Sequence, residues 1–182
     1  MAYVIEKVQV IGDYKYVVIF GDIGHRCGYI ALKPDHPLFG VKYSGEVNYP
    51  ELLQEIKSST IGKKSILSVV CWDGETTNLD LLIDVHGGLT YSGGSKKGRY
   101  PMLQFDEVWW LGFDCGHYGD GQDLVAMHKH FPKRLKELGK FGFWNQGGLV
   151  RSLEYVSAEC ERAIQQLKCV EDTIRELTNA NR

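Results

Sequence analysis

Residues 3–20 read YVIEKVQVIGDYKYVVIF, and this stretch indicates the class of the fold. Two runs of β-branched and aromatic residues, 3–11 and 14–20, are separated by Gly12 and Asp13. Glycine and aspartate are favoured in the two-residue turns that connect neighbouring antiparallel strands. The stretch therefore predicts a β-hairpin, and with it an antiparallel sheet.

Four later segments are also rich in apolar and β-branched residues and predict further strands: CGYIAL at 27–32, SILSVVCW at 65–72, TTNLDLLIDV at 76–85 and FDEVWWLGFD at 105–114. Asp73 and Gly74 lie between the second and third of them and predict another hairpin turn. The segment NYPELLQEIKSS at 48–59 has a proline near its start and leucines and an isoleucine on one helical face. It predicts a short helix of about ten residues.

The C-terminal region shows a different periodicity. From Leu149 to Leu177, apolar residues recur at alternating spacings of four and three, which predicts one long helix. This apolar stripe has two interpretations: it packs across the sheet, or it forms a seam with a second copy of the chain or another partner. The sequence thus predicts an α+β fold with an antiparallel β-rich domain at 1–148, and a long helix at 149–182 that packs on it or projects from it.

Composition excludes several classes of protein. Of the 182 residues, 43% are hydrophobic and 24% are charged, which is typical of a globular domain. The net charge of -2 provides no general attraction to nucleic acid or to an anionic membrane. Five cysteines, an odd number, argue against a disulfide framework. The first residues do not resemble a signal peptide, and no apolar run reaches the roughly 18 residues that span a bilayer. We therefore expect a cytoplasmic protein without direct nucleic-acid binding.

Potential metal ligands gather in three glycine-rich segments, each of which follows an apolar run: GDIGHRCGY at 21–29, DVHGGLTYSGG at 84–94 and GFDCGHYGD at 112–120. The first contains His25 and Cys27, the second His86, and the third Cys115 and His117. In an antiparallel sheet, strand ends of this kind can meet at one edge. We therefore predict a metal site at an edge of the sheet.

Thiolate and imidazole are the ligands of structural zinc sites, which are tetrahedral and closed by four protein side chains. On a flat strand, side chains two positions apart lie about 7 Å from each other, so each pair needs a turned backbone, which neighbouring glycines allow. The predicted ligands are His25, Cys27, Cys115 and His117, with His86 as the first alternative. Zinc or a similar transition metal is the predicted cofactor.

Two other arrangements use the same segments. In the first, His86 and His117 hold a catalytic metal together with Asp114 or Asp120, and a coordination position stays open for water. In the second, the thiol of Cys27 or Cys115 is a nucleophile and His86 is its base.

A glycine-rich basic loop follows the second segment. Lys96, Lys97 and Arg99 lie within GGLTYSGGSKKGR at 87–99 and form a candidate contact for phosphate or an acidic partner. The lysines do not have the spacing of a phosphate-binding P-loop, and the residues that follow show no helical pattern. A surface loop is the main interpretation.

Four motifs together carry a resemblance to known proteins: GHRCGY at 24–29, HGGLTYSG at 86–93, WWLGFDCGH followed by Gly119-Asp120, and a C-terminal helix containing EYVSAECERAIQQL. With these motifs the chain resembles a family of short proteins of phages and prophages, over residues 20 to 168. The resemblance implies an accessory protein of a mobile element that acts in the cytosol of a bacterial host.

The size of the chain and its histidine and cysteine site are also similar to those of zinc-containing anti-CRISPR proteins, which implies inhibition of a Cas nuclease such as Cas9. In that function a structural zinc would support a protein-binding surface, and no turnover is expected. Two functions of other classes remain open: a metal-dependent hydrolase of a nucleotide or phosphoester, and a protein that sequesters a nucleotide. A homodimer through the C-terminal helix is a further possibility.

Overall fold

The computed structural model describes residues 2–47, 77–94, 107–140 and 147–180. Several predictions fall outside these ranges: the helix at 48–59, the strand at 65–72, the turn at Asp73-Gly74 and the basic side chains of Lys96, Lys97 and Arg99.

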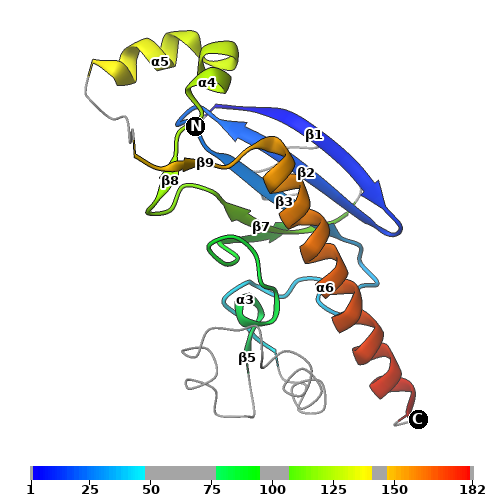
Figure 1. The fold of residues 1–182 in the computed structure, drawn as a ribbon. Helices are drawn as coiled ribbons and strands as arrows, with labels where there is room; N and C mark the ends of the chain where they lie inside the picture. The colour runs from blue at the N-terminus through cyan, green and yellow to red at the C-terminus, as the bar shows by residue number, and fades with distance from the viewer. Residues whose placement is uncertain (1, 48–76, 95–106, 141–146, 181–182) are drawn as a thin grey trace.

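A five-stranded antiparallel sheet is the centre of the fold (Figure 1). In spatial order its strands are β1 (Tyr3–Ile11), β2 (Tyr14–Gly21), β3 (Arg26–Leu32), β7 (Trp109–Asp114) and β6 (Tyr91–Gly94). Residues 3–20 form the predicted hairpin, with Ile11 opposite Tyr14 across the turn. The predicted α+β class, with an antiparallel sheet and a long C-terminal helix, is confirmed.

Shorter elements connect these strands. They are β4 (Glu46–Val47), β5 (Thr77–Asn78), β8 (Asp120–Gly121), β9 (Leu149–Val150), α3 (Leu79–Leu82), α4 (Leu124–His130), α5 (Pro132–Gly139) and α6 (Leu153–Ala180). Helix α4 is capped at its start by Asp123, whose Oδ1 accepts the backbone N–H of Ala126 at 2.9 Å. In the described part of the chain, no helix has the length and apolar character needed to cross a membrane.

Helix α6 packs across one face of the sheet (Figure 1). Along its length, seven apolar residues from Val156 to Ile174 are buried in the same core cluster as Tyr16, Ile30 and Phe113 of the sheet. Gly28 of β3 allows this close approach, because a Cβ there would lie only 2.6 Å from Sγ of Cys160. The apolar stripe of the helix is thus part of the core of a single chain, and a dimer through this helix stays a prediction.

Three predicted elements differ in the structure. Residues 91–94, which were predicted as part of a surface loop, form strand β6 and pair with β7. The strand predicted at 76–85 is instead a short strand followed by helix α3, because Leu79, Leu82 and Ile83 bury their side chains on one side of a helical turn. The long helix begins at Leu153 and not at Leu149. Residues Leu149 and Val150 pair in parallel with Asp120 and Gly121, which holds them extended.

A buried arginine joins the elements at one end of the sheet. Arg26 of β3 is 6% exposed, and its Nε and Nη2 contact both carboxylate oxygens of Glu6, at 2.6 and 3.2 Å. Its Nη1 donates to Asp123 Oδ2 at 2.8 Å and to the backbone carbonyl of Arg151 at 3.1 Å. One guanidinium therefore connects strand β1, the cap of α4 and the segment that leads into α6.

Candidate metal centre

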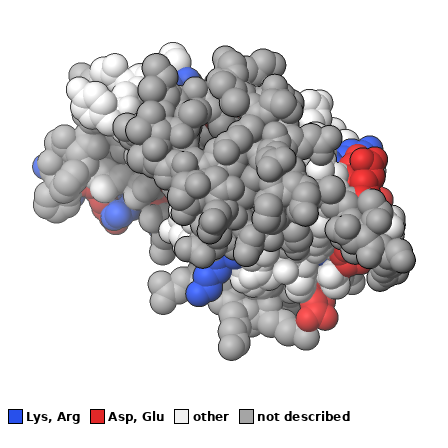
Figure 2. Space-filling view, turned by 90° about the horizontal axis from the view of Figure 1, so that it is seen from below, with Lys and Arg blue, Asp and Glu red and all other residues white. Residues whose placement is uncertain are grey.

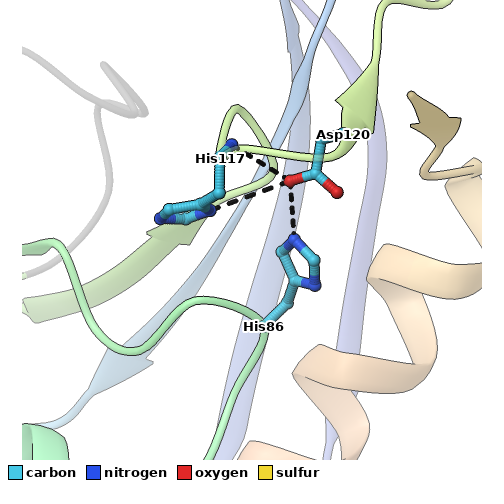
Figure 3. Close-up of side chains that lie close together, drawn as sticks. All are labelled: His86, His117 and Asp120. Carbon is cyan, nitrogen blue, oxygen red and sulfur yellow. Dashed lines mark hydrogen bonds and ion pairs between the residues drawn. The ribbon is translucent and has the colours of Figure 1, made fainter. Parts of the chain in front are cut away.

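His86, His117 and Asp120 come from two separate loops and lie together beyond the end of β7 (Figure 3). His86 follows α3, His117 lies in the turn after β7, and Asp120 begins β8. One potential ligand atom from each lies within 4.8 Å of the others. Among the described residues, these three side chains form the group of histidine, cysteine or acidic residues whose ligand atoms are close enough to share one metal ion.

The carboxylate of Asp120 is the centre of this group. The residue is 2% exposed, and its Oδ2 lies 2.8 Å from Nε2 of His86 and accepts the backbone N–H of His117 at 3.0 Å. Its Oδ1 accepts from Nε of Arg151 at 2.8 Å. Burial by itself raises the pKa of Asp120, but the hydrogen bonds from Arg151, His86 and His117 outweigh it and hold that pKa below its ordinary value. Asp120 is therefore an ionised acceptor.

His117 has a free coordinating atom. Its Nδ1 is buried and has no hydrogen-bond partner, and it lies 3.8 Å from Oδ2 of Asp120. A buried polar atom without a partner is uncommon, because its lost hydration is not replaced. In the tautomer that carries its proton on Nε2, the unshared electron pair of this nitrogen is what a metal ion would use.

The backbone at Gly87 leaves room for the imidazole of His117. A Cβ at Gly87 would lie 2.1 Å from Cε1 of His117, and the φ angle of Gly87 is +69°. Both observations require glycine at this position. The residue also explains how two histidines from distant parts of the sequence approach, with ring centroids 5.6 Å apart for His86 and His117.

Helix α6 holds the His86 loop in place. Glu159 accepts the backbone N–H of His86 at 2.8 Å, and Gln166 both accepts from the N–H of Asp84 and donates to its carbonyl. The hydroxyl of Tyr155 lies 3.1 Å from Nδ1 of His86. Because the other ring nitrogen faces an ionised carboxylate, it carries the proton, and Tyr155 donates to Nδ1. The ring of His86 is thus fixed from both sides.

His25 lies beside the group without joining it. Its ring packs against Gly116, where a Cβ would come within 3.6 Å of Cγ of His25, and its Nδ1 is buried without a hydrogen-bond partner. Burial lowers the pKa of His25 below its ordinary value, although the carbonyl of Cys115 and the charge of Asp120 act in the opposite direction. His25 is therefore a neutral imidazole at pH 7.

The structure does not bring the two cysteines to the histidines. Cys27 pairs with Asp114 across the sheet and packs with Tyr29 on the face away from α6. Cys115, the residue after Asp114, is buried in the core on the α6 face. Successive side chains of a strand point to opposite faces, so the two thiols are separated by the sheet itself. The four-ligand set of His25, Cys27, Cys115 and His117 is not assembled.

The thiols are also poor nucleophiles. Burial raises the pKa of Cys27 to about 12, with a further contribution from the charge of Asp114. Burial likewise raises the pKa of Cys115, which is 1% exposed. Both are neutral thiols at pH 7, and the nucleophilic form of cysteine is the thiolate. The arrangement with His86 as a base for either thiol therefore has no support.

Two contributors to the group were not predicted from the sequence, Tyr155 and Arg151. Tyr155 and Glu159 are four residues apart and so share a helix face, which the sequence does show. Nothing in the sequence indicates that this face meets the loop at 84–88. Arg151 precedes the helix in an extended segment that the periodicity assigned to the helix itself.

Comparison with known proteins adds no relative. No family model, curated protein or solved structure matches the chain. The chemistry of the group is therefore interpreted from its own residues. Two imidazoles and one carboxylate are typical of catalytic zinc sites and of non-haem iron sites, which keep other coordination positions open. Structural zinc sites are closed by four protein ligands instead.

Proposed function

We propose that this protein is a zinc-dependent hydrolase of phosphoesters, with His86, His117 and Asp120 as the metal ligands. The observation that carries the proposal is the buried and unpartnered Nδ1 of His117 beside the ionised carboxylate of Asp120. Three protein ligands leave a coordination position open. A zinc ion held there would lower the pKa of a water molecule in that position to near 7.

Hydrogen bonds around the ligands support this assignment. When Nε2 of His86 is a ligand, its proton is displaced and the ring carries its proton on Nδ1. The hydroxyl of Tyr155, 3.1 Å away, then accepts from Nδ1. Ligand histidines generally donate their second N–H to such a partner, which fixes the tautomer and the orientation of the ring. Tyr155 therefore positions His86 in both states.

The position of Arg151 beside Asp120 supports the proposal that the substrate is an anion. Its Nε donates to Asp120, and its guanidinium lies over the ring of Tyr155, 4.9 Å from the ring centroid. Its side chain is 23% exposed. Guanidinium groups bind phosphate oxygens well because their donors match the geometry of the anion. On the face in Figure 2, the described charged side chains include both basic and acidic residues.

His25 is suited to accept a proton. Because its pKa is lowered by burial, the imidazole is neutral at pH 7, and its unpartnered Nδ1 would act as a base when a water molecule reaches it. A histidine in this role contributes about 10²-fold or more to a rate. His25 thus has a function in the site without being a ligand.

The first test is the metal content of purified protein. We expect about one zinc ion per chain in the wild type, because three ligands converge on one position. His117→Ala and Asp120→Asn should lower the content to background, since each leaves two ligands. Tyr118→Ala is the matched control, because Tyr118 is fully exposed next to His117. Cys27→Ser and Cys115→Ser should keep the metal wherever circular dichroism shows that they fold. Full zinc in His117→Ala would contradict the proposed ligands.

The second test is hydrolysis of bis(p-nitrophenyl) phosphate by zinc-loaded protein. His25→Ala should keep its zinc and lose about 10²-fold in kcat, because it removes a base and no ligand. His128→Ala is the control, since His128 is an exposed histidine of α4. Equal rates in the wild type and His25→Ala would remove His25 from the reaction. A zinc-loaded wild type without turnover on this and other phosphoesters would refute the hydrolase.

A second candidate function is supported by exposed apolar side chains beside the group. Tyr118, Val125 and Leu149 are 108%, 82% and 63% exposed. Such residues suit a protein-binding surface. The resemblance to phage proteins and the inhibition of a Cas nuclease in the host cytosol stay predictions, and this surface would serve them. A metal-loaded protein that shows no turnover would favour this candidate.

A further inference from the structure

Helices α4 and α5 form a basic arm at the end of the molecule near the N-terminus (Figure 1). This basic arm, residues 124–140, contains four lysines and one arginine against a single acidic residue, Glu137. Its formal charge is therefore +4, and because the whole chain carries -2, the remaining residues together carry -6. A local cluster of one sign attracts its opposite even where the net charge of the protein does not.

The cations of the basic arm face solvent. All five are exposed: Lys129, Lys133, Arg134, Lys136 and Lys140. The other side of α5 faces the domain, where Leu135 and Leu138 pack on the core cluster that contains Phe20 and Met127. Two helical faces are thus distinguished, an apolar one against the protein and a basic one toward the surroundings.

Aliphatic side chains are exposed at the start of the basic arm. Val125 is 82% exposed and Leu124 is 43% exposed. Leu149 and Val150, 63% and 43% exposed, lie on β9, which pairs with the strand that precedes the arm. Exposed aliphatic side chains beside a basic helical face are typical of elements that bind at the interface of a lipid bilayer.

Hydrogen bonds fix the start of the arm to the sheet. The backbone N–H of Asp123 donates to the carbonyl of Gly24 at 2.9 Å, and its carboxylate both caps α4 and pairs with the buried guanidinium of Arg26. Leu124 and Val125 follow this anchored residue directly. They are therefore held at the surface by ordered neighbours.

Three kinds of anionic partner suit a basic arm: a lipid surface, an acidic protein and a nucleic acid. Four of the five cations are lysines, and lysine is depleted in protein–protein interfaces. Attraction to anionic lipid depends on the charge, to which lysine and arginine contribute alike. Nucleic acid leaves the exposed Val125 without a function, because bases stack on aromatic side chains. An anionic lipid surface accounts for both the lysines and the aliphatic residues.

We propose that the basic arm binds the anionic surface of a lipid bilayer, with its lysines at the headgroups and Leu124 and Val125 in the interface. Binding of this kind attaches the protein to one leaflet. The arm contains none of His86, His117 and Asp120, so this proposal does not depend on zinc or on hydrolysis.

The test is sedimentation of the protein with lipid vesicles. We expect binding to phosphatidylcholine vesicles that contain about one-third phosphatidylserine, and binding at least about tenfold weaker to phosphatidylcholine alone. High salt should release the protein from the anionic vesicles, because salt screens exposed charges. Lys133→Gln combined with Lys136→Gln should weaken binding about 25-fold, since each charge near the surface contributes about fivefold. Lys42→Gln combined with Lys168→Gln removes two exposed lysines elsewhere and is the matched control.

A change at Val125 tests the aliphatic part of the proposal separately from the charges. Val125→Ser should weaken binding to the anionic vesicles about fivefold, because less apolar area leaves water, and Val125→Leu should bind at least as tightly as the wild type. Equal binding of Val125→Ser and the wild type would overturn the interfacial position of this residue.

Two results would overturn the proposal as a whole. The first is the absence of binding to the anionic vesicles, or binding that the double change at Lys133 and Lys136 leaves unaltered. The second is preferential binding of the arm to a duplex DNA or to polyglutamate, added in competition with the vesicles, which would assign it to a nucleic acid or an acidic protein.

Discussion

Leu167→Glu should abolish the folded state. Leu167 is 0% exposed in the core between helix α6 and the sheet, and no described cation lies in that apolar cluster to pair with a new carboxylate. Burying an ion in such surroundings costs at least several kcal/mol, and the packing of the leucine is lost as well. A domain of this kind is stable by only about 5–15 kcal/mol. We expect no cooperative thermal transition by circular dichroism.

Gln165→Glu is the matched control. Gln165 is exposed on the same helix, so the substitution adds the same charge on the solvent side. Its melting temperature should stay within a few degrees of the wild type, because surface changes usually alter stability by less than about 0.5 kcal/mol. A folded Leu167→Glu protein with a smaller mass in solution would contradict the core assignment. That result would instead support a seam between two chains.

Arg26→Ala should destabilise the protein by about 3–5 kcal/mol, the usual cost of removing one partner from a buried ion pair. The substitution leaves Glu6 and Asp123 without their shared cation, and side chains of Arg26 and Glu6 are 7% and 10% exposed. The cap of α4 and the segment before α6 lose their common donor at the same time. Urea unfolding measured by tryptophan fluorescence gives the free energy.

Arg134→Ala provides the comparison for Arg26→Ala. Arg134 pairs with Glu137 on the surface of α5, where the two side chains are 43% and 61% exposed. Exposed pairs of this kind contribute about 0–1 kcal/mol. The unfolding midpoint of Arg134→Ala should therefore stay close to that of the wild type. Equal midpoints for Arg26→Ala and Arg134→Ala would mean that the buried network does not hold these elements together.

Local patterns in the sequence predicted four of the five strands of the sheet, and the fifth, β6, lies in a segment that was predicted as a surface loop. The hairpin at 3–20 has strand-forming residues on both sides of a two-residue turn, and both the turn and the pairing depend on residues adjacent in the chain. Strands β3 and β7 follow from their apolar character in the same way. The C-terminal helix follows from the periodicity of its apolar residues. Each of these features depends on residues that are close together in the sequence.

Helix α3 and the start of α6 were not accessible to such patterns. Leu79, Leu82 and Ile83 can serve a strand or a helical turn, and the decision depends on which core surface they meet. Leu149 fits the periodicity of the helix, yet its backbone N–H bonds to the carbonyl of Gly119 and keeps it extended. In both cases a contact with a distant part of the chain outweighs the local preference.

For the candidate metal centre, the sequence by itself determined which segments take part. Histidines after β2, after α3 and after β7 were predicted to meet, and His86 and His117 do so, with His25 alongside. Which of these side chains meet was decided only by the tertiary structure. Cys27 and Cys115 lie outside this group. Cys27 pairs with Asp114 across the sheet, and Cys115, the next residue, points to the opposite face. Asp120 joins the group as an ionised carboxylate. The fold brings Arg151, His86 and His117 to it, and their hydrogen bonds lower its pKa.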